Sequence, residues 1–134
     1  QADFDALAAE APAGVSLVRF RQDFASLLAG AKLSVSQAGY NTVCDILRAG
    51  CRSLLVPFTA GGETEQPVRA RRLEAMNIAS VLTEADLTAA SMTQKIREAL
   101  SRPKPPAYAL DLDGAQRSAA VLRSLLPAPI LPSE

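Results

Sequence analysis

Short apolar runs alternate with longer segments of helical periodicity along this chain, and this alternation restricts its fold more than any other feature. Apolar, β-branched runs at residues 15–20, 33–36, 53–58 and 78–82 predict strands. The segments between them are too long for hairpins, so neighbouring strands are expected to run parallel. The pattern therefore predicts an α/β fold: a doubly wound parallel sheet with helices on both faces.

Helical spacing of apolar residues predicts the helices between and after these strands. They are expected at residues 22–31, 41–49, 66–76, 88–101 and 114–126. Gly50 predicts a left-handed cap after the second helix, and Ser91 with Gln94 has the spacing of a capping box in the fourth. The Pro-rich residues 102–107 predict a linker before the last helix, and the length of 134 residues predicts one domain, 1–134.

Composition excludes several classes of function. The 14 basic and 14 acidic residues cancel, so we expect no nucleic-acid partner, and no apolar run approaches the length of a transmembrane segment. Histidine is absent, which excludes Ser-His and Cys-His nucleophile systems and His-ligated zinc. Cys44 and Cys51 are expected to be small buried residues of a cytosolic protein. The chain begins without Met, which suggests a fragment of a longer protein.

The loop after the second predicted strand carries residues suited to an anion. In a parallel sheet, ligands bind at the carboxyl ends of the strands. Gly39 allows a close backbone approach or a positive φ, and Asn41 and Thr42 open a helix whose free N–H groups attract phosphate. Asp45, one turn further on, is placed to reach a ribose. A capped turn, with Asn41 as the cap and Asp45 facing the helix dipole, explains the same spacing.

The loop after the third predicted strand repeats the arrangement. A flexible Gly61-Gly62 pair leads to Glu65 and Gln66 at a helix start. A carboxylate beside an amide offers acceptors and donors that suit sugar hydroxyls. A solvated loop followed by a polar first turn is the alternative.

Two further motifs have structural interpretations. The run "ALDLDG" at residues 109–114 has paired carboxylates that suit Mg2+, but too little chain follows it for a phosphotransferase, so we interpret Asp113 as a helix cap. The basic run "RARRLE" at residues 69–74 is interpreted mostly as a solvated helix face.

The stretch "SQAGYNTVCDILRAGCRSLLVPFTAGGETEQ" resembles the donor-binding segment of GT-B glycosyltransferases. The resemblance is to bacterial family 28 enzymes, which add N-acetylglucosamine to a lipid-linked peptidoglycan precursor, and to plant UDP-sugar transferases. It covers about residues 15–100 and corresponds to the C-terminal, Rossmann-like half of those enzymes. It implies that the chain is an incomplete nucleotide-sugar-binding domain, truncated at its N-terminal side.

Matching positions imply the donor site. The resemblance implies Phe20 and Arg21 at the base, Gln37, Ala38, Gly39, Asn41 and Thr42 at the diphosphate, Asp45 at the ribose, and Glu65 and Gln66 at the sugar. Two positions depart from the family. Gln37 stands where the plant enzymes have a histidine, and Asp45 is one methylene shorter than the usual glutamate.

The resemblance also implies the reaction. The parent protein is expected to move a hexose or N-acetylhexosamine from a UDP-sugar to an acceptor, in the cytoplasm, without a cofactor or metal. An N-terminal acceptor domain, absent here, would hold the general base and any peripheral membrane contact. We therefore expect no catalytic residue in this chain and no activity from it alone. The alternative is a non-catalytic sugar-nucleotide-binding module or a subunit that needs a partner chain.

Overall fold

The computed structural model describes residues 2–105 and 114–126, and its centre is a three-stranded parallel sheet. The strands β1 (Ser34–Ser36), β2 (Ser53–Leu55) and β3 (Ser80–Val81) lie side by side in that order. Val35 lies opposite Leu54 in the register of β1 and β2. All three strands run the same way, so their carboxyl ends share one edge, as the alternating pattern predicted.

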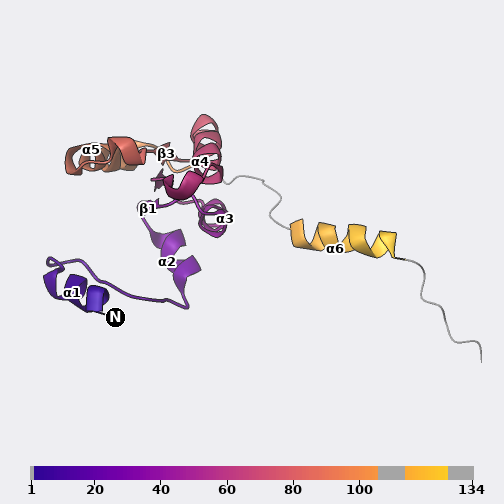
Figure 1. The fold of residues 1–134 in the computed structure, drawn as a ribbon, viewed down its shortest axis with the longest axis horizontal. Helices are drawn as coiled ribbons and strands as arrows, with labels where there is room; N and C mark the ends of the chain where they lie inside the picture. Colours follow the sequence, from indigo (N-terminus) through magenta and orange to yellow (C-terminus); the bar gives the residue numbers. More distant parts are fainter. Residues whose placement is uncertain (1, 106–113, 127–134) are drawn as a thin grey trace, which may run out of the picture.

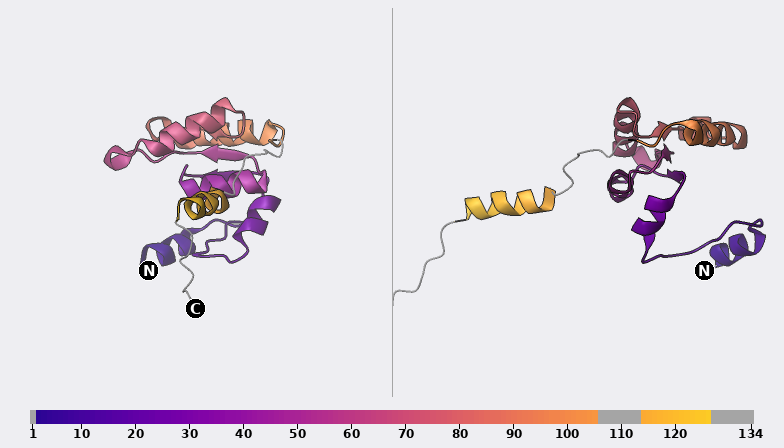
Figure 2. Two further views of the ribbon diagram at one scale, coloured as in Figure 1. Left: turned by 90° about the vertical axis from the view of Figure 1, so that its right-hand side faces the viewer. Right: turned by 180° about the vertical axis from the view of Figure 1, so that it is seen from behind.

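Helices cover both faces of this sheet. The helices of the described residues are α1 (Ala2–Glu10), α2 (Phe24–Gly30), α3 (Tyr40–Ala49), α4 (Glu65–Ala75), α5 (Ala89–Ser101) and α6 (Gly114–Leu125), with 3-10 turns η1 (Ala60–Gly62) and η2 (Glu84–Asp86); α1 and α6 lie away from the sheet (Figure 1). In Figure 1, α3 and α4 lie on one side of the strands and α5 on the other. The view from behind in Figure 2 shows the same separation. The doubly wound α/β prediction is confirmed.

The strand predicted at residues 15–20 is wrong. These residues form an irregular segment, and Val15, Val18 and Phe20 are 52%, 57% and 80% exposed. A strand needs a neighbour for its backbone hydrogen bonds and a surface that covers its side chains. No described residue pairs with this segment as a strand. The helix α1 before it was not predicted.

Helix ends follow local chemistry, with one error in the prediction. Gly50 caps α3 with a φ of 59°, in the left-handed region, as predicted. The capping box of α5 is formed by Thr88 and Ser91, not by Ser91 and Gln94, because the helix begins one turn earlier than that spacing assumed. Thr88 N–H donates to Ser91 Oγ at 2.9 Å, and Ser91 N–H donates to Thr88 Oγ1 at 3.1 Å. Gln94 instead donates to Glu98 on the helix surface.

The core lies between the sheet and the helices α3 and α4. Its most deeply buried large side chains are Ile46 and Leu55, together with Cys51, while the equally buried Leu54 lies outside this cluster. Burial raises the pKa of the Cys51 thiol. Cys44 is half-buried, and neither cysteine is in a disulfide. Cys51 thus fills the place of a small apolar residue, as expected from the sequence.

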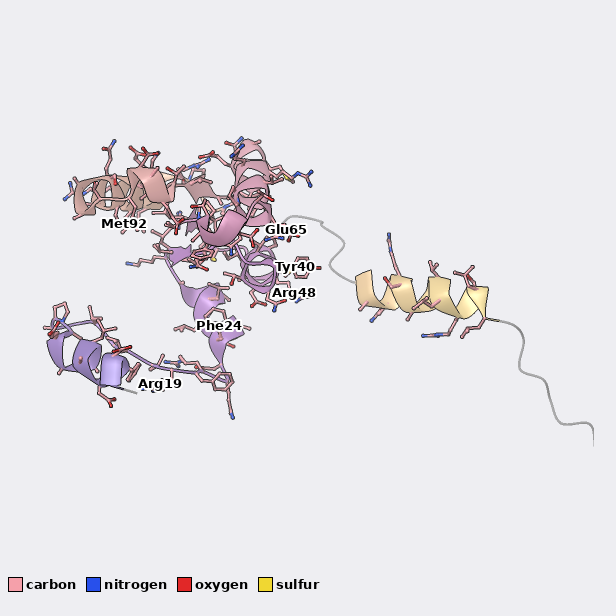
Figure 3. All side chains as sticks on the ribbon, viewed as in Figure 1. Arg19, Phe24, Tyr40, Arg48, Glu65 and Met92 are labelled. Carbon is pink, nitrogen blue, oxygen red and sulfur yellow. The ribbon has the colours of Figure 1, made fainter. Side chains whose placement is uncertain are left out.

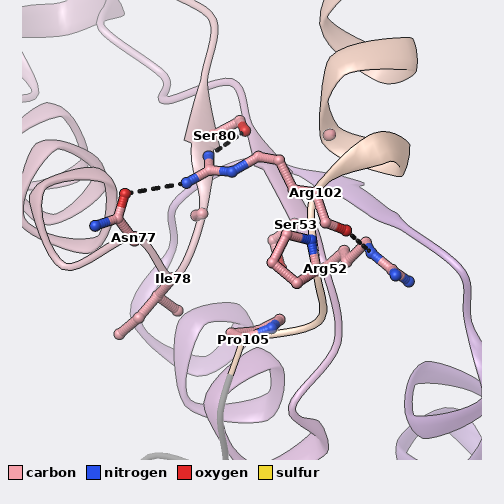
Figure 4. A pocket seen from close by; sticks show the side chains of 10 residues that line it. Arg52, Ser53, Asn77, Ile78, Ser80, Arg102 and Pro105 are labelled. Carbon is pink, nitrogen blue, oxygen red and sulfur yellow. Dashed lines mark hydrogen bonds between the residues drawn. The ribbon is translucent and has the colours of Figure 1, made fainter.

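Arg102 ties the chain after α5 to the amino ends of the strands (Figure 4). Its guanidinium donates to Ser80 Oγ at 2.9 Å and to Asn77 Oδ1 at 3.2 Å. Arg52 Nε in turn donates to the Arg102 carbonyl at 2.6 Å. These contacts line a small pocket on the opposite edge from the carboxyl ends. We interpret this pocket as part of a structural strap, because its polar groups bond to one another.

Several sequence features fall outside the described residues. Residues 106–113, which include Asp113 and most of the "ALDLDG" motif, are among them. The helix predicted at residues 114–126 is present as α6. In the described part of the chain, no helix combines the length and apolar character that a membrane crossing requires.

Candidate functional site

Side chains join the loops at the carboxyl ends of the strands. Gln66, in the first turn of α4, accepts two backbone hydrogen bonds at its Oε1 atom: one from Ala38 N–H at 3.1 Å and one from Phe58 N–H at 3.2 Å. Glu84 accepts from Thr59 N–H at 2.9 Å and from the Thr59 hydroxyl. The loop after β2 is therefore fastened to the loop after β1 on one side and to the loop after β3 on the other.

Gly39 is the N-cap of α3, and its backbone conformation is ordinary. Its φ is −60°, so the positive φ offered as one reason for glycine does not occur. A Cβ atom built there would meet only Thr42 Oγ1, at 3.9 Å, an ordinary contact. The folded backbone therefore accepts alanine at this position. The other reason offered for glycine, close approach to a ligand, remains a prediction.

The start of α3 has no side-chain cap. The helix begins at Tyr40, so Asn41 is its second residue, and the interpretation of Asn41 as the cap is wrong. The first N–H groups of a helix have no partner within the helix and carry its positive dipole end. Ala38 is fully buried beside this start, Gln37 and Asn41 are exposed, and Thr42 is half-buried. This part of the loop is thus chemically suited to an anion.

The start of α4 is different because its own chain caps it. Glu63 accepts from Glu65 N–H at 2.6 Å and from Gln66 N–H at 3.3 Å. A carboxylate already occupies the positive end of this helix. Of the starts of α3 and α4, that of α3 is therefore the one suited to an external anion.

Asp45 lies one turn into α3, where it is half-buried. It lines a groove along that helix together with Tyr40, Asn41, Cys44 and Arg48. Figure 3 labels Tyr40 and Arg48 on this side of α3, with Glu65 of α4 close by. The lining residues extend from Tyr40, at the uncapped start of α3, to Arg48 in its last turn.

Arg69 also belongs to this region, although the sequence analysis treated it only as part of a solvated basic run. Its Nη1 donates to the Ala38 carbonyl at 2.7 Å, and its Nη2 pairs with Glu65 Oε2 at 3.3 Å. The guanidinium also lies 5.9 Å from the centre of the Tyr40 ring. The other arginines of the basic run, Arg71 and Arg72, are exposed as expected. The sequence shows only that Arg69, three residues after Gln66, lies on the same helix face; its contact with Ala38 has no local signal.

Phe20 and Arg21 lie apart from the other predicted site residues. They belong to the segment between α1 and α2, which Figure 1 places beyond α2, away from the starts of α3 and α4. Phe20 is 80% exposed, and Arg21 pairs with Asp23 at 2.6 Å, which lowers the pKa of that carboxyl. Arg19 of the same segment stacks over the Phe4 ring of α1, 4.1 Å from its centre. Their contact with a nucleotide base remains a prediction.

A family model and the curated relatives of this chain indicate the same protein family. The model of the glycosyltransferase family 28 C-terminal domain matches residues 2–120. The chain is 34% identical over 85 residues to the UDP-N-acetylglucosamine–N-acetylmuramyl-(pentapeptide) pyrophosphoryl-undecaprenol N-acetylglucosamine transferase of Anaeromyxobacter sp. (strain Fw109-5), covering 63% of this chain and 22% of that protein. It is 32% identical over 103 residues to the enzyme of the same name from Xanthomonas campestris pv. campestris (strain 8004), covering 77% and 24%.

A solved structure agrees on the fold. The glycotransferase of kitacinnamycin superposes with a TM-score of 0.67 and 22% identity over 88% of this chain and 31% of that one. The chain thus spans about a quarter of the length of the curated relatives it matches. Because the family model covers most of the chain, from α1 into α6, the chain belongs to the glycosyltransferase family 28 C-terminal domain family.

Proposed function

We propose that the protein carrying this chain transfers a hexose or N-acetylhexosamine from a UDP-sugar to an acceptor, and that this chain binds the donor. The observation that carries the proposal is that the uncapped start of α3 lies next to Glu65 and Gln66 at the start of α4. Gln66 joins the two by its hydrogen bond to Ala38 N–H. The relatives are named as transferases of N-acetylglucosamine with UDP-N-acetylglucosamine as substrate, which supports this chemistry.

The diphosphate would lie at the start of α3. Gln37 would offer its amide N–H, while Gly39, Asn41 and Thr42 would offer backbone N–H groups. Transfer breaks the bond between the anomeric carbon and the diphosphate, so negative charge develops on the leaving group. Donors fixed at a helix start stabilise such charge without reorganising. This interaction strengthens as the bond breaks, which is what lowers the barrier.

The remaining groups of the donor would bind on either side. Asp45 would accept hydrogen bonds from the ribose hydroxyls in the groove along α3, and Phe20 with Arg21 would contact the base. Glu65 and Gln66 would contact the sugar. Gln66 uses its Oε1 for Ala38 and Phe58, so its Nε2 is the atom that would donate to a sugar hydroxyl.

The general base and the acceptor site are assigned to parts of the protein outside this chain. On this proposal the chain by itself binds a donor but does not transfer the sugar. We expect the protein to act in the cytoplasm and to contact a membrane surface, if at all, through those other parts.

Calorimetric titration with UDP, TDP and GDP tests the donor assignment. UDP should bind to the protein, and Asp45→Ala should weaken it by about tenfold, since a charge-assisted hydrogen bond is lost. Glu74→Ala is the matched control, because it removes a carboxylate from an exposed position on α4. If none of the three nucleotides binds, or if Asp45→Ala and Glu74→Ala bind UDP as the wild type does, the assignment is wrong.

Release of UDP from UDP-N-acetylglucosamine and other UDP-sugars, measured with the protein of which this chain is part, tests the reaction. Sugar transfer to a lipid-linked or soluble acceptor supports the enzyme. UDP binding without any transfer would indicate a sugar-nucleotide-binding module instead.

A further inference from the structure

The two peptide units that flank Ala38 are both held from α4: Gln66 bonds to the Gln37–Ala38 peptide and Arg69 to the Ala38–Gly39 peptide. Gln66 Oε1 accepts from Ala38 N–H at 3.1 Å, and Arg69 Nη1 donates to the Ala38 carbonyl at 2.7 Å. Gln66 and Arg69 are three residues apart in α4, so both side chains lie on one helix face. Ala38 has no exposed surface, and its polar backbone groups bond to protein. One helix therefore sets the orientation of the loop that leads into another.

The Arg69 side chain is itself fixed. It is only 24% exposed, pairs with the Glu65 carboxylate at 3.3 Å and lies over the Tyr40 ring. A planar guanidinium with contacts on several sides loses little further freedom when it donates to a carbonyl. Its charge is thus kept at the Ala38 carbonyl and next to the start of α3.

We propose that Arg69 is a positioning residue for the donor diphosphate, acting through the Ala38–Gly39 peptide. The Ala38 carbonyl and the Gly39 N–H belong to the same peptide unit. A cation bonded to the carbonyl polarises that unit, which makes the Gly39 N–H a stronger donor. Arg69 also fixes the plane of the peptide, so the Gly39 N–H is held in one direction at the uncapped start of α3. The inference rests on the proposed function, because it needs a phosphate at that start.

Binding of UDP and of uridine separates this role from general support of the fold. Arg69→Gln should weaken UDP binding by about tenfold, the effect of one charge-assisted hydrogen bond, and leave uridine binding unchanged. Arg72→Gln removes the same charge from an exposed position one turn further along α4 and should change UDP binding by less than about twofold. The UDP affinity of Arg69→Lys should lie between those of the wild type and Arg69→Gln. Calorimetry measures UDP binding, and NMR titration measures the weaker binding of uridine.

The Gly39 amide gives a second readout without ligand. In the proton–nitrogen spectrum, Arg69→Gln should move the Gly39 amide proton to lower frequency, because the peptide is less polarised, and Arg72→Gln should leave it in place. Thermal unfolding checks that each variant folds. If Arg69→Gln does not fold, Arg69→Lys takes its place, with a smaller loss of UDP affinity and unchanged uridine binding as the expected result.

The outcomes distinguish the inference from the proposed function. If the wild type binds UDP but Arg69→Gln behaves as Arg72→Gln does, the inference is overturned and the proposed function stands. Equal losses of UDP and uridine affinity in the Arg69 variants overturn the inference as well, since they indicate a general loosening of the loop. If the wild type binds no UDP, the proposed function fails, and the inference fails with it.

Discussion

Gln66 offers the sharpest test of how the two carboxyl-end loops are held together. Its Oε1 atom accepts from two backbone N–H groups, Ala38 at 3.1 Å and Phe58 at 3.2 Å. Gln66→Ala removes the acceptor of both and leaves the helix propensity of α4 unharmed, since alanine favours helices. The substitution therefore measures the loop connection itself.

The expected cost follows from the burial of the two donors. Ala38 is fully buried, so its N–H would lose its acceptor without gaining water, at a cost of about 1–3 kcal/mol. Phe58 is exposed, and water can replace its lost partner, so that bond adds roughly 0.5 kcal/mol. We expect Gln66→Ala to lower the free energy of unfolding by about 1.5–3.5 kcal/mol, which for a chain of this size corresponds to a melting temperature lower by about 5–12 °C.

Urea unfolding followed by circular dichroism measures this difference. Gln66→Glu is the matched variant, because a carboxylate oxygen accepts the same two N–H groups, and it should retain most of the stability. Gln94→Ala is the surface control: its amide bonds to Glu98 on the exposed face of α5, and its loss should cost less than about 0.5 kcal/mol. A Gln66→Ala variant that unfolds at the same urea concentration as the Gln94→Ala variant would refute the reasoning.

Three more outcomes are expected. Gly39→Ala should leave the melting temperature unchanged, because the φ of Gly39 is −60°. The same substitution should weaken UDP binding if the backbone lies close to the diphosphate, and unchanged UDP affinity in calorimetry would count against that close contact. Iodoacetamide should label the half-buried Cys44 before Cys51 in the native protein, since burial raises the pKa of the Cys51 thiol. The stability that the neutral Cys51 thiol contributes is present below its ordinary pKa of 9.0 and is lost as the pH rises further. Cys51→Ala should remove this pH dependence from urea-unfolding curves. Arg102→Ala should lower the free energy of unfolding by about 1–2 kcal/mol, while the exposed Arg97→Ala should change it by less than about 0.5 kcal/mol; equal urea midpoints would show that the strap contributes nothing.

The stretch from β1 to α4 was predictable because its signals are local. The αL cap at Gly50 and the apolar stripe of α3 need only neighbouring residues to act, and both are present in the structure. The segment at residues 15–20 has the same β-branched composition, yet it is irregular and exposed. Composition supplies a preference for extended backbone, whereas a strand also requires a partner that only the folded sheet provides.

The candidate site likewise has a part that was predicted and a part that was not. Family resemblance placed Gly39, Asp45, Glu65 and Gln66 in two loops and the helix starts that follow them, and these two regions do lie together at one edge of the sheet. The bond from Arg69 to Ala38, which joins residues 31 apart, could not be predicted from the sequence. The basic run predicts a solvated helix face, and only the packing of α4 against the loop after β1 leaves Arg69 half-buried.

The class of fold, the order of its central elements and the loops that carry the site follow from hydrophobic periodicity, glycine caps and motif order, which act over a few residues or through family likeness. Which polar groups meet depends on the packing of the folded chain. It gave Gln66 its two backbone donors, capped α4 with Glu63 while leaving α3 without a side-chain cap, and set Arg69 against the Ala38 carbonyl. Those contacts join segments distant in the chain, and they form only when parallel strands bring their carboxyl ends to a common edge.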